Sequence, residues 1–262
     1  MKLTVDVGNT TTSFGFFENN ELKRVLTIDT DVKRTFDQFL VVVKNLLEHE
    51  SFLMVQLEEA IISSVVPMET KKLSRFIYTI YGIDPLILGP GIKTGLLLKV
   101  DNPNEVGSDL VAVSVGALEF FKAPFLIVDL GTVNKYILID EKKQFVGVSF
   151  TPGVMMSKDA LDKNTALLMQ VSLEKPLRVI GKNTKDALNS GLTYGTVAQI
   201  RGMSELINHE AGLQLPVIIT GGNAIFIYED LVKGKQNQYS YNNNLIHYGL
   251  NAILSKNKRN VI

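Results

Sequence analysis

Two distant stretches of the chain repeat one unusual pattern, an apolar run that ends in Asp-x-Gly and continues into a second apolar run. The first is LTVDVGNTTTSFGFF at residues 3–17, and the second is LIVDLGTVNKYILID at residues 126–140. The β-branched and aromatic residues after each glycine favour a second strand over a helix. Each stretch therefore predicts a β-hairpin, and the repetition predicts two similar lobes with a ligand-binding cleft between them.

Predicted strands and helices alternate through both halves of the chain, which is typical of an α/β protein. Thr35 and Gln38 have the spacing of a capping box at a helix start, and a second helix is expected between Pro67 and Gly82. We expect an N-terminal lobe over residues 1–122 and a C-terminal lobe over residues 123–262. Further helices are predicted over 104–121, 153–170 and 184–210.

The composition argues against several classes of function. Lysine and arginine together number 27, as do aspartate and glutamate, so no net positive charge favours nucleic acid or anionic lipid. The absence of cysteine excludes disulfides and thiolate chemistry. Asp6 interrupts the first apolar run too early for a signal peptide, and no uncharged apolar run is long enough to span a membrane. We expect a cytoplasmic protein without a nucleic-acid or membrane partner.

The two Asp-x-Gly corners have the chemistry of phosphate-binding loops. Gly8 and Gly131 would let backbone N–H groups approach a polyphosphate, and Asp6 would hold a hydrated Mg²⁺ that bridges phosphate oxygens. Further amide and hydroxyl donors follow at Asn9, Thr10, Thr11 and Thr12. Neither G-x-x-x-x-G-K-[ST] nor G-x-G-x-x-G is present. A single such corner is more often a plain turn, but the duplication and a third glycine corner, IITGGNA at 218–224, favour phosphate binding.

Other polar residues allow two interpretations. Asp109, at a predicted helix start, would either cap that helix or accept a hydroxyl proton during attack on a γ-phosphate. Asn183 and Thr184 begin another predicted helix, where the residues alone favour capping over ligand contact. The histidines match no metal-ligand spacing and are interpreted as surface or helix-end residues. They are His49, His209 and His247.

Taken together, a series of motifs resembles the type III pantothenate kinases. They occur in the family's order from residue 6 to about residue 224: DVGNTTT, ISSVVP, LGPGIKTGL, DNPNEVGSD, VDLGT, TPGV, VIGKNT with SGLTYG, and TGGNA. The resemblance implies two actin-like (ribonuclease H-like) lobes, as in acetate and sugar kinases, chaperone ATPases and actin. It also implies an enzyme, a phosphotransferase with an alcohol acceptor, that converts pantothenate to 4'-phosphopantothenate at the start of coenzyme A biosynthesis. The implied cofactors are ATP, Mg²⁺ and a monovalent cation (K⁺ or NH₄⁺), and the implied assembly is a homodimer.

The resemblance further implies roles for individual residues. Asp109 would be the base that activates the pantothenate hydroxyl, Asp129 would bind the monovalent cation, and Thr132 would contact the nucleotide phosphates. Asp6 would bind metal as well as nucleotide. The first phosphate loop would comprise Asp6, Val7, Gly8, Asn9, Thr10, Thr11, Thr12 and Ser13. Pantothenate would be bound at Val100, Gly107, Ser108, Asp109, Leu110 and Thr184, and for Thr184 this contact replaces the capping interpretation.

Three departures from the family pattern fall around the expected substrate pocket. Leu110 follows the catalytic aspartate where arginine is usual, and Val100 replaces a usual tyrosine. The third departure is DLGTVNK in place of DFGTATT, which introduces Val133, Asn134 and Lys135. Losing a charge-assisted contact costs ~1.5–3 kcal/mol. Lys135 would restore a positive charge only if it faces the site, and a strand residue has two faces.

These departures leave other functions open. One is a catalytically weakened or inactive relative that binds nucleotide and acts as a regulatory protein. Another is a related sugar kinase or phosphatase.

Overall fold

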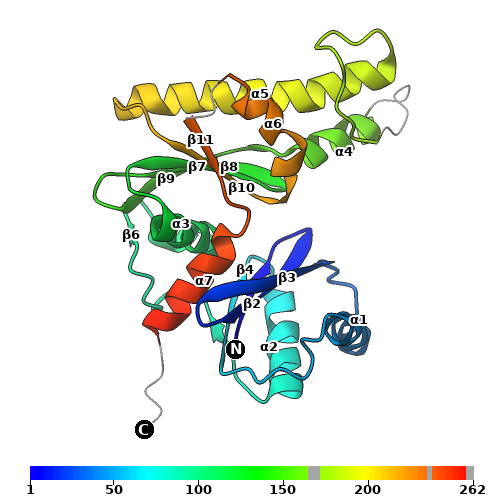
Figure 1. Ribbon diagram of the computed structural model, residues 1–262, viewed down its shortest axis with the longest axis vertical. Helices are drawn as coiled ribbons and strands as arrows, with labels where there is room; N and C mark the ends of the chain where they lie inside the picture. Colours follow the sequence, from blue (N-terminus) through cyan, green and yellow to red (C-terminus); the bar gives the residue numbers. More distant parts are fainter. Residues whose placement is uncertain (165–171, 235–237, 258–262) are drawn as a thin grey trace. The chain divides into compact units, whose positions relative to one another are not determined.

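The computed structural model describes residues 1–164, 172–234 and 238–257, and the chain divides into two compact units. Unit 1 comprises Met1–Leu96, Asp101–Phe120 and the chain from Leu245 on, whereas unit 2 comprises Leu97–Val100 and Phe121–Asn244. Each unit contains one mixed β-sheet with helices (Figure 1). The chain enters unit 2 at Phe121, next to the expected boundary at 122. Residues 245–257, which the sequence assigns to the C-terminal lobe, are part of unit 1.

The sheet of unit 1 has the strand order β3-β2-β1-β4-β5. The first three strands form an antiparallel meander, and β4 and β5 run parallel to β1. Their bounds are β1 Lys2–Val7, β2 Thr11–Glu18, β3 Glu21–Asp29, β4 Glu59–Ser64 and β5 Leu86–Ile87. The predicted β1–β2 hairpin is confirmed. The edge strand β3 was not predicted, because it carries exposed charged residues at Lys23 and Arg24 that mask its period of two.

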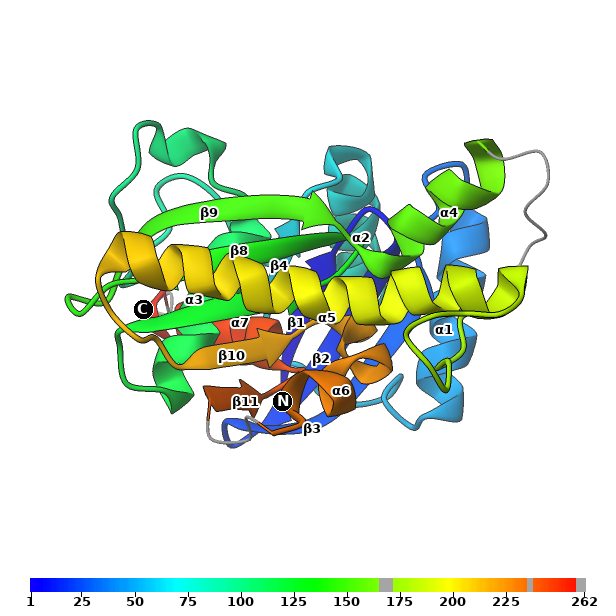
Figure 2. The ribbon, with the colours of Figure 1, turned by 90° about the horizontal axis from the view of Figure 1, so that it is seen from above.

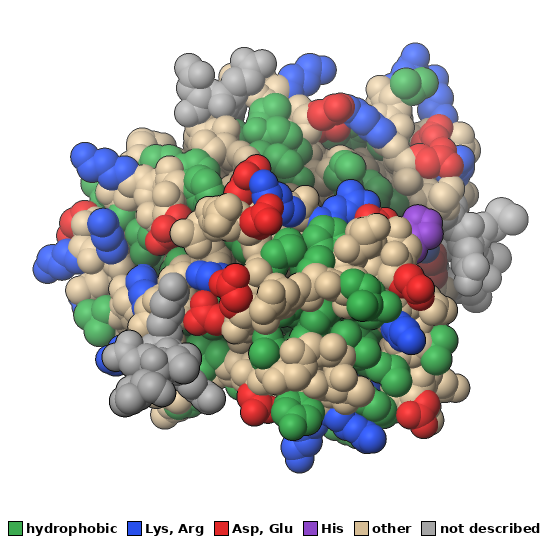
Figure 3. All heavy atoms as spheres, turned by 60° about the horizontal axis from the view of Figure 1, so that its bottom comes forward, with side chains coloured by type: hydrophobic (Ala, Val, Ile, Leu, Met, Phe, Trp, Pro, Cys, Tyr) green, Lys and Arg blue, Asp and Glu red, His purple; other side chains and the backbone are tan. Residues whose placement is uncertain are grey.

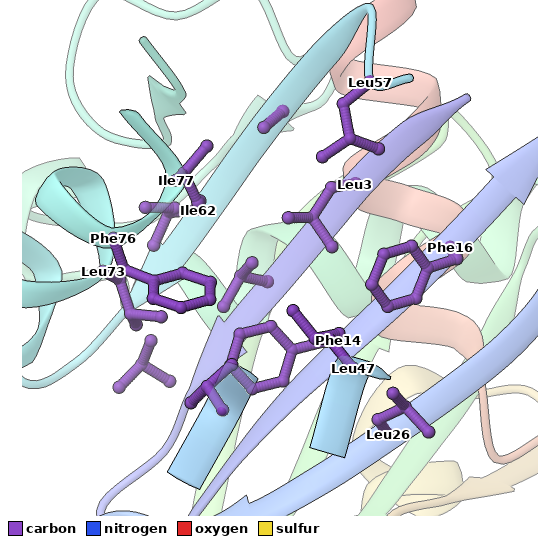
Figure 4. Close-up of a cluster of buried hydrophobic side chains, with 14 of the residues drawn as sticks. Leu3, Phe14, Phe16, Leu26, Leu47, Leu57, Ile62, Leu73, Phe76 and Ile77 are labelled. Carbon is purple, nitrogen blue, oxygen red and sulfur yellow. The ribbon is translucent and has the colours of Figure 1, made fainter. Parts of the chain in front are cut away.

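Helices cover both faces of this sheet. Alternation along β1 turns Leu3, Val5 and Val7 toward α1 (Phe36–His49) and α2 (Pro67–Tyr81), where they join the apolar core shown in Figure 4. Thr4 points to the opposite face, which packs against α7 (Leu245–Lys256) and, beside it, α3 (Ser108–Phe120). A short 3₁₀ helix, η1 (Pro103–Glu105), precedes α3.

Two glycines allow α7 to pack closely against α3 in unit 1. A Cβ on Gly116 of α3 would overlap the carbonyl oxygen of Leu245, and a Cβ on Gly249 of α7 would overlap that of Ala112. The two helix backbones therefore touch directly at Gly116 and Gly249. No side chain larger than hydrogen fits at either position without displacing a helix.

The predicted capping box of α1 is present. Thr35 accepts a hydrogen bond from the Gln38 backbone N–H (3.3 Å), and the Gln38 side chain accepts one from the Thr35 N–H (3.0 Å). We expect Thr35→Ala to lower the free energy of unfolding by about 1 kcal/mol, because the Gln38 backbone N–H loses its partner, the Thr35 hydroxyl. Urea denaturation measures this, with Thr79→Ala, at an exposed position in the last turn of α2, as the matched control. Equal effects of the two substitutions would contradict the capping role.

The sheet of unit 2 repeats that of unit 1, with the strand order β11-β10-β7-β8-β9-β6. Strands β7, β8 and β9 form the antiparallel meander, and β10 and β11 run parallel to β7 as β4 and β5 do to β1. Their bounds are β6 Leu97–Leu98, β7 Phe125–Leu130, β8 Val133–Ile139, β9 Gln144–Pro152, β10 Val217–Thr220 and β11 Tyr239–Tyr241. The repeated sequence pattern thus corresponds to a repeated strand topology.

One face of the second sheet is covered by α5 (Thr184–Ala211), which runs along the strands in both Figure 1 and Figure 2. Val197 and Ile200 of α5 pack on Val128, Leu130 and Tyr136. The remaining helices of this unit are α4 (Val154–Asn164), η2 (Gly222–Phe226) and α6 (Tyr228–Val232). The end of the helix predicted over 153–170 lies outside the described residues.

Candidate functional site

The β1–β2 corner is a tight hairpin turn. The Gly8 N–H donates to the Thr11 carbonyl oxygen at 2.9 Å, and a Cβ on Gly8 would lie 3.2 Å from that oxygen. The close approach therefore favours glycine. Because its N–H is used within the turn, Gly8 shapes the predicted phosphate loop and leaves contact with a ligand to its neighbours.

The corner residues divide into exposed and internal groups. Val7 is 1% exposed and belongs to the core. Thr30 donates its hydroxyl proton to the Gly8 carbonyl (2.9 Å), so Thr12, whose hydroxyl lies 2.9 Å from that of Thr30, donates to Thr30. The side chains of Val7 and Thr12 thus have structural roles. Those with access to solvent or a ligand are Asp6 and Ser13, which are half-buried, and Asn9, Thr10 and Thr11, which are exposed.

The start of α3 is hydrogen-bonded to the end of β4, which pairs with the end of β1. Asp6 and Ser63 are register partners on β1 and β4. The Ser63 hydroxyl is 3.0 Å from the Ser108 hydroxyl, which also accepts the Ser64 N–H at 3.2 Å. Ser63 and Ser64 were not assigned a role from the sequence, although they occur in the ISSVVP motif. They link the predicted phosphate corner to the predicted catalytic helix within one unit.

Asp109 is the second residue of α3, in the first turn of that helix. A Cβ on Gly107 would overlap Asp109 Oδ1, so the Asp109 carboxylate folds back over residue 107. The partial positive charge at the helix N-terminus stabilises a carboxylate in this position. Leu110, the residue in place of the family's arginine, is 5% exposed and packs inside the unit. Val100 is half-buried and belongs to unit 2.

The β7–β8 corner of unit 2 is enclosed by two other segments. Gly153 donates its N–H to the Thr132 carbonyl at 3.0 Å, and a Cβ on Gly153 would overlap the carbonyls of Gly131 and Thr132. Gly221 has φ 92°, and its Cβ would lie 2.6 Å from the Leu130 N. The third glycine corner predicted from the sequence therefore packs directly on this turn. Gly131 has only ordinary contacts at its own Cβ position, so Gly153 and Gly221 are the glycines that the geometry requires.

The two new polar residues of β8 lie on opposite faces of the strand. Lys135 is opposite Asp129 in the β7–β8 register, and its Nζ lies 2.7 Å from Asp129 Oδ2. Asn134 is buried on the α5 side, where its amide donates to the Pro152 carbonyl (3.2 Å) and to Gln199 (3.4 Å). Asn134 and Lys135 therefore cannot both face one substrate pocket on the same side of β8, because successive strand residues alternate between faces.

At the start of α5, the structure shows which of Asn183 and Thr184 caps the helix. Asn183 is the N-cap, and its side-chain oxygen accepts the Asp186 N–H at 2.8 Å. Thr184 is the first helical residue and is exposed. Its predicted contact with pantothenate stays a prediction.

His247 is a helix-end residue, in the first turn of α7, but it does not lie at the surface, because it is 2% exposed. Thr4 Oγ1 donates to the Gly15 carbonyl (3.1 Å) and lies 2.8 Å from His247 Nδ1. Since the hydroxyl has one proton, Nδ1 carries a proton and donates it to Thr4. Burial lowers the pKa of His247 to about 4, so the ring is neutral near pH 7. A Cβ on Gly15 would lie 2.6 Å from Nδ1, which explains the glycine within β2.

The charged side chains are interspersed. Figure 3 shows lysine and arginine side chains scattered among aspartate and glutamate over the face that it presents.

Across residues 1–164, 172–234 and 238–257, no three histidine or acidic side chains form a metal-binding group. Mg²⁺ usually takes one or two carboxylates and completes its shell with phosphates and water, so a single partly buried Asp6 fits such a metal. None of the helices in the described ranges is both long enough and apolar enough to cross a lipid bilayer.

Comparison with solved structures identifies the class of fold. A Sinorhizobium meliloti protein described as a 2-dehydro-3-deoxygalactonokinase matches with a TM-score of 0.58 and 12% identity, over 100% of this chain and 99% of its own. MreB 5 of Spiroplasma citri, bound to AMPPNP, matches with a TM-score of 0.53 and 10% identity, over 97% and 96% of the two chains. The protein therefore has the fold of actin-like ATPases and sugar kinases.

The family is narrower than the fold. A Campylobacter jejuni protein described as a Baf family transcriptional activator matches with 21% identity and a TM-score of 0.57, over 97% of this chain and 98% of its own. Residues 2–206 match the family model of type III pantothenate kinase. Because this match covers most of the sequence, the chain belongs to the type III pantothenate kinase family.

Proposed function

We propose that the protein transfers the γ-phosphoryl group of ATP to the primary hydroxyl of pantothenate, forming 4'-phosphopantothenate. The observation that carries the proposal is the convergence within unit 1 of the β1–β2 corner and the start of α3, in a chain that belongs to this family. In the proposed reaction, the γ-phosphoryl group leaves ADP as the alcohol oxygen attacks it, and the hydroxyl proton passes to Asp109.

Asp109 suits the role of general base. A carboxylate in the first turn of a helix is stabilised by the helix dipole, and it can accept the alcohol proton as phosphorus–oxygen bonding develops. The helix start that carries Asp109 is anchored by the hydrogen bonds of Ser108 to β4. These bonds position the start of the helix, and positioning is the main protein contribution in phosphoryl transfer.

The β1–β2 corner suits the polyphosphate. Asn9, Thr10 and Thr11 are exposed residues with side-chain donors, and Asp6 would hold Mg²⁺, which when bound neutralises charge on the phosphates. Thr132 lies at the equivalent corner of unit 2 and is proposed to contact the same class of ligand. The proposed assembly is a cytoplasmic homodimer, as the family implies.

A second function is favoured by one observation. Leu110 is buried and apolar where the family has arginine, so a positive charge for substrate or phosphate is missing beside Asp109. A protein that binds nucleotide and has little or no turnover would tolerate this change. The alternative is therefore a nucleotide-binding regulatory protein.

Turnover distinguishes the two functions. We expect purified protein with Mg-ATP to release ADP only when pantothenate is added, and ³¹P NMR to show a phosphomonoester product. A pantothenate analogue without the primary hydroxyl is the matched control and should not stimulate ADP release. Nucleotide binding by calorimetry, without turnover at any pantothenate concentration, would favour the regulatory protein and count against the kinase.

A further inference from the structure

The β7–β8 register places an ammonium on the carboxylate that the family resemblance assigns to a monovalent cation. Asp129 and Lys135 are direct partners on adjacent antiparallel strands, so their side chains lie on the same face. Lys135 Nζ is 2.7 Å from Asp129 Oδ2, within the range of a charge-assisted hydrogen bond. The two side chains are only 20% and 15% exposed, so solvent screens this pair less than a surface pair.

The other carboxylate oxygen is also closely surrounded. Oδ1 of Asp129 lies against the backbone of Gly221, where an added Cβ would be 2.5 Å from it. Gly221 is held in this position by its positive φ of 92°, at the end of a strand whose Thr220 pairs with Asp129. Both oxygens of the Asp129 carboxylate therefore have close neighbours: the Lys135 ammonium contacts Oδ2, and the Gly221 backbone lies against Oδ1.

This arrangement does not fit a free monovalent cation at Asp129. K⁺ and NH₄⁺ would compete with a tethered ammonium of the same charge for the same oxygens. A second cation placed about 4 Å from the ammonium would be repelled strongly enough to lower its affinity on the order of a hundredfold. The resemblance places an uncharged threonine at this position, as in DFGTATT, whereas this chain has Lys135, so the added positive charge comes from the lysine.

We propose that the Lys135 ammonium substitutes for a bound monovalent cation at Asp129, so that this protein binds nucleotide without K⁺ or NH₄⁺. The part of this inference that concerns nucleotide binding rests on the proposed function, whereas the replacement of the cation at Asp129 does not. An alkylammonium supplies the same single positive charge as K⁺. Because it is part of the chain, it is present in every molecule at any salt composition, and it stabilises the corner beside the predicted phosphate contact at Thr132.

The test compares wild type with Lys135→Thr, which restores the family residue. Binding of Mg-AMPPNP is measured by calorimetry in KCl, NaCl and choline chloride at equal ionic strength. We expect the wild-type Kd to be the same in all three salts, and the Lys135→Thr Kd to be about tenfold or more weaker in choline and to recover in KCl. Lys142→Thr, an exposed lysine on the β8–β9 turn, is the matched control and should behave as wild type.

A second readout needs no nucleotide. We expect KCl in place of choline chloride to leave the wild-type Tm unchanged and to raise the Tm of Lys135→Thr, whose Asp129 then accepts the added ion. Potassium-specific stabilisation of wild type, or a Lys135→Thr variant indifferent to potassium in both readouts, would overturn the inference. If no nucleotide bound in any salt, the proposed function would fail, and the unfolding comparison would still decide the role of Lys135.

Discussion

Asp109→Asn is expected to lower pantothenate-dependent ADP release by about 10²–10⁴-fold, because asparagine keeps the size and polarity of the side chain but cannot accept the substrate proton. The KM for pantothenate should change little, since the loss concerns the transition state more than binding. Steady-state kinetics over a range of pantothenate concentrations separate kcat from KM.

Asp37→Asn is the matched control for this substitution. Asp37 also lies in the first turn of a helix of unit 1, and it is exposed and outside the candidate site. Both variants lose one favourable interaction with a helix dipole, so both should lose a similar, small amount of stability, about 0.3–1 kcal/mol. Full activity of Asp109→Asn, or an equal loss in Asp37→Asn, would exclude Asp109 as the base.

Acidification is expected to destabilise unit 1 through His247. Its pKa of about 4 in the folded protein lies below the ordinary value of 6.5, so the unfolded chain binds more protons between these values. The contribution of neutral His247 to stability is therefore fully present above pH 6.5 and is lost progressively as the pH falls toward 4. Between pH 7.5 and 4.5 the loss amounts to about 2–3 kcal/mol.

His247→Asn isolates this contribution from other titrating groups. Asparagine can keep a donor toward Thr4 Oγ1, but it does not titrate, so the variant should be less stable than wild type near neutral pH and lose less stability on acidification. Urea unfolding at pH 7.5 and pH 4.5 measures both effects, and His49→Gln, at an 85% exposed position of the same unit, is the control. Identical pH dependence of wild type and His247→Asn would show that the ring is not a buried neutral group.

Local sequence patterns predicted the elements that position the candidate site. The Asp-x-Gly corners, the capping box at Thr35 and the helix between Pro67 and Gly82 all follow from residue types close together in the chain, and the structure has each of them. The repeated hairpin also predicted a repeated topology, which the two sheets share. These features depend on turn chemistry and side-chain period, both of which act over a few residues.

Features that depend on packing between distant segments could not be predicted. The direction of Lys135 required the exact register of β8 against β7, since a shift by one residue reverses the face. The burial of His247 required knowing that the last helix packs against Thr4, 243 residues earlier. The link from Ser63 to Ser108 likewise joins two segments whose proximity is set by the sheet and not by either motif.

The place of α7 in unit 1 has a consequence for synthesis. One face of the first sheet packs against both α3 and α7, and α7 is available only when residues 245–256 have been made, although the strands beneath it are among the first residues of the chain. During translation, the face of β1 and β4 that packs against α7 stays uncovered by this helix until α7 is made. By then all residues of the second unit, whose segments end at Asn244, have been synthesised. The folding of unit 1, and not that of unit 2, therefore depends on the synthesis of α7.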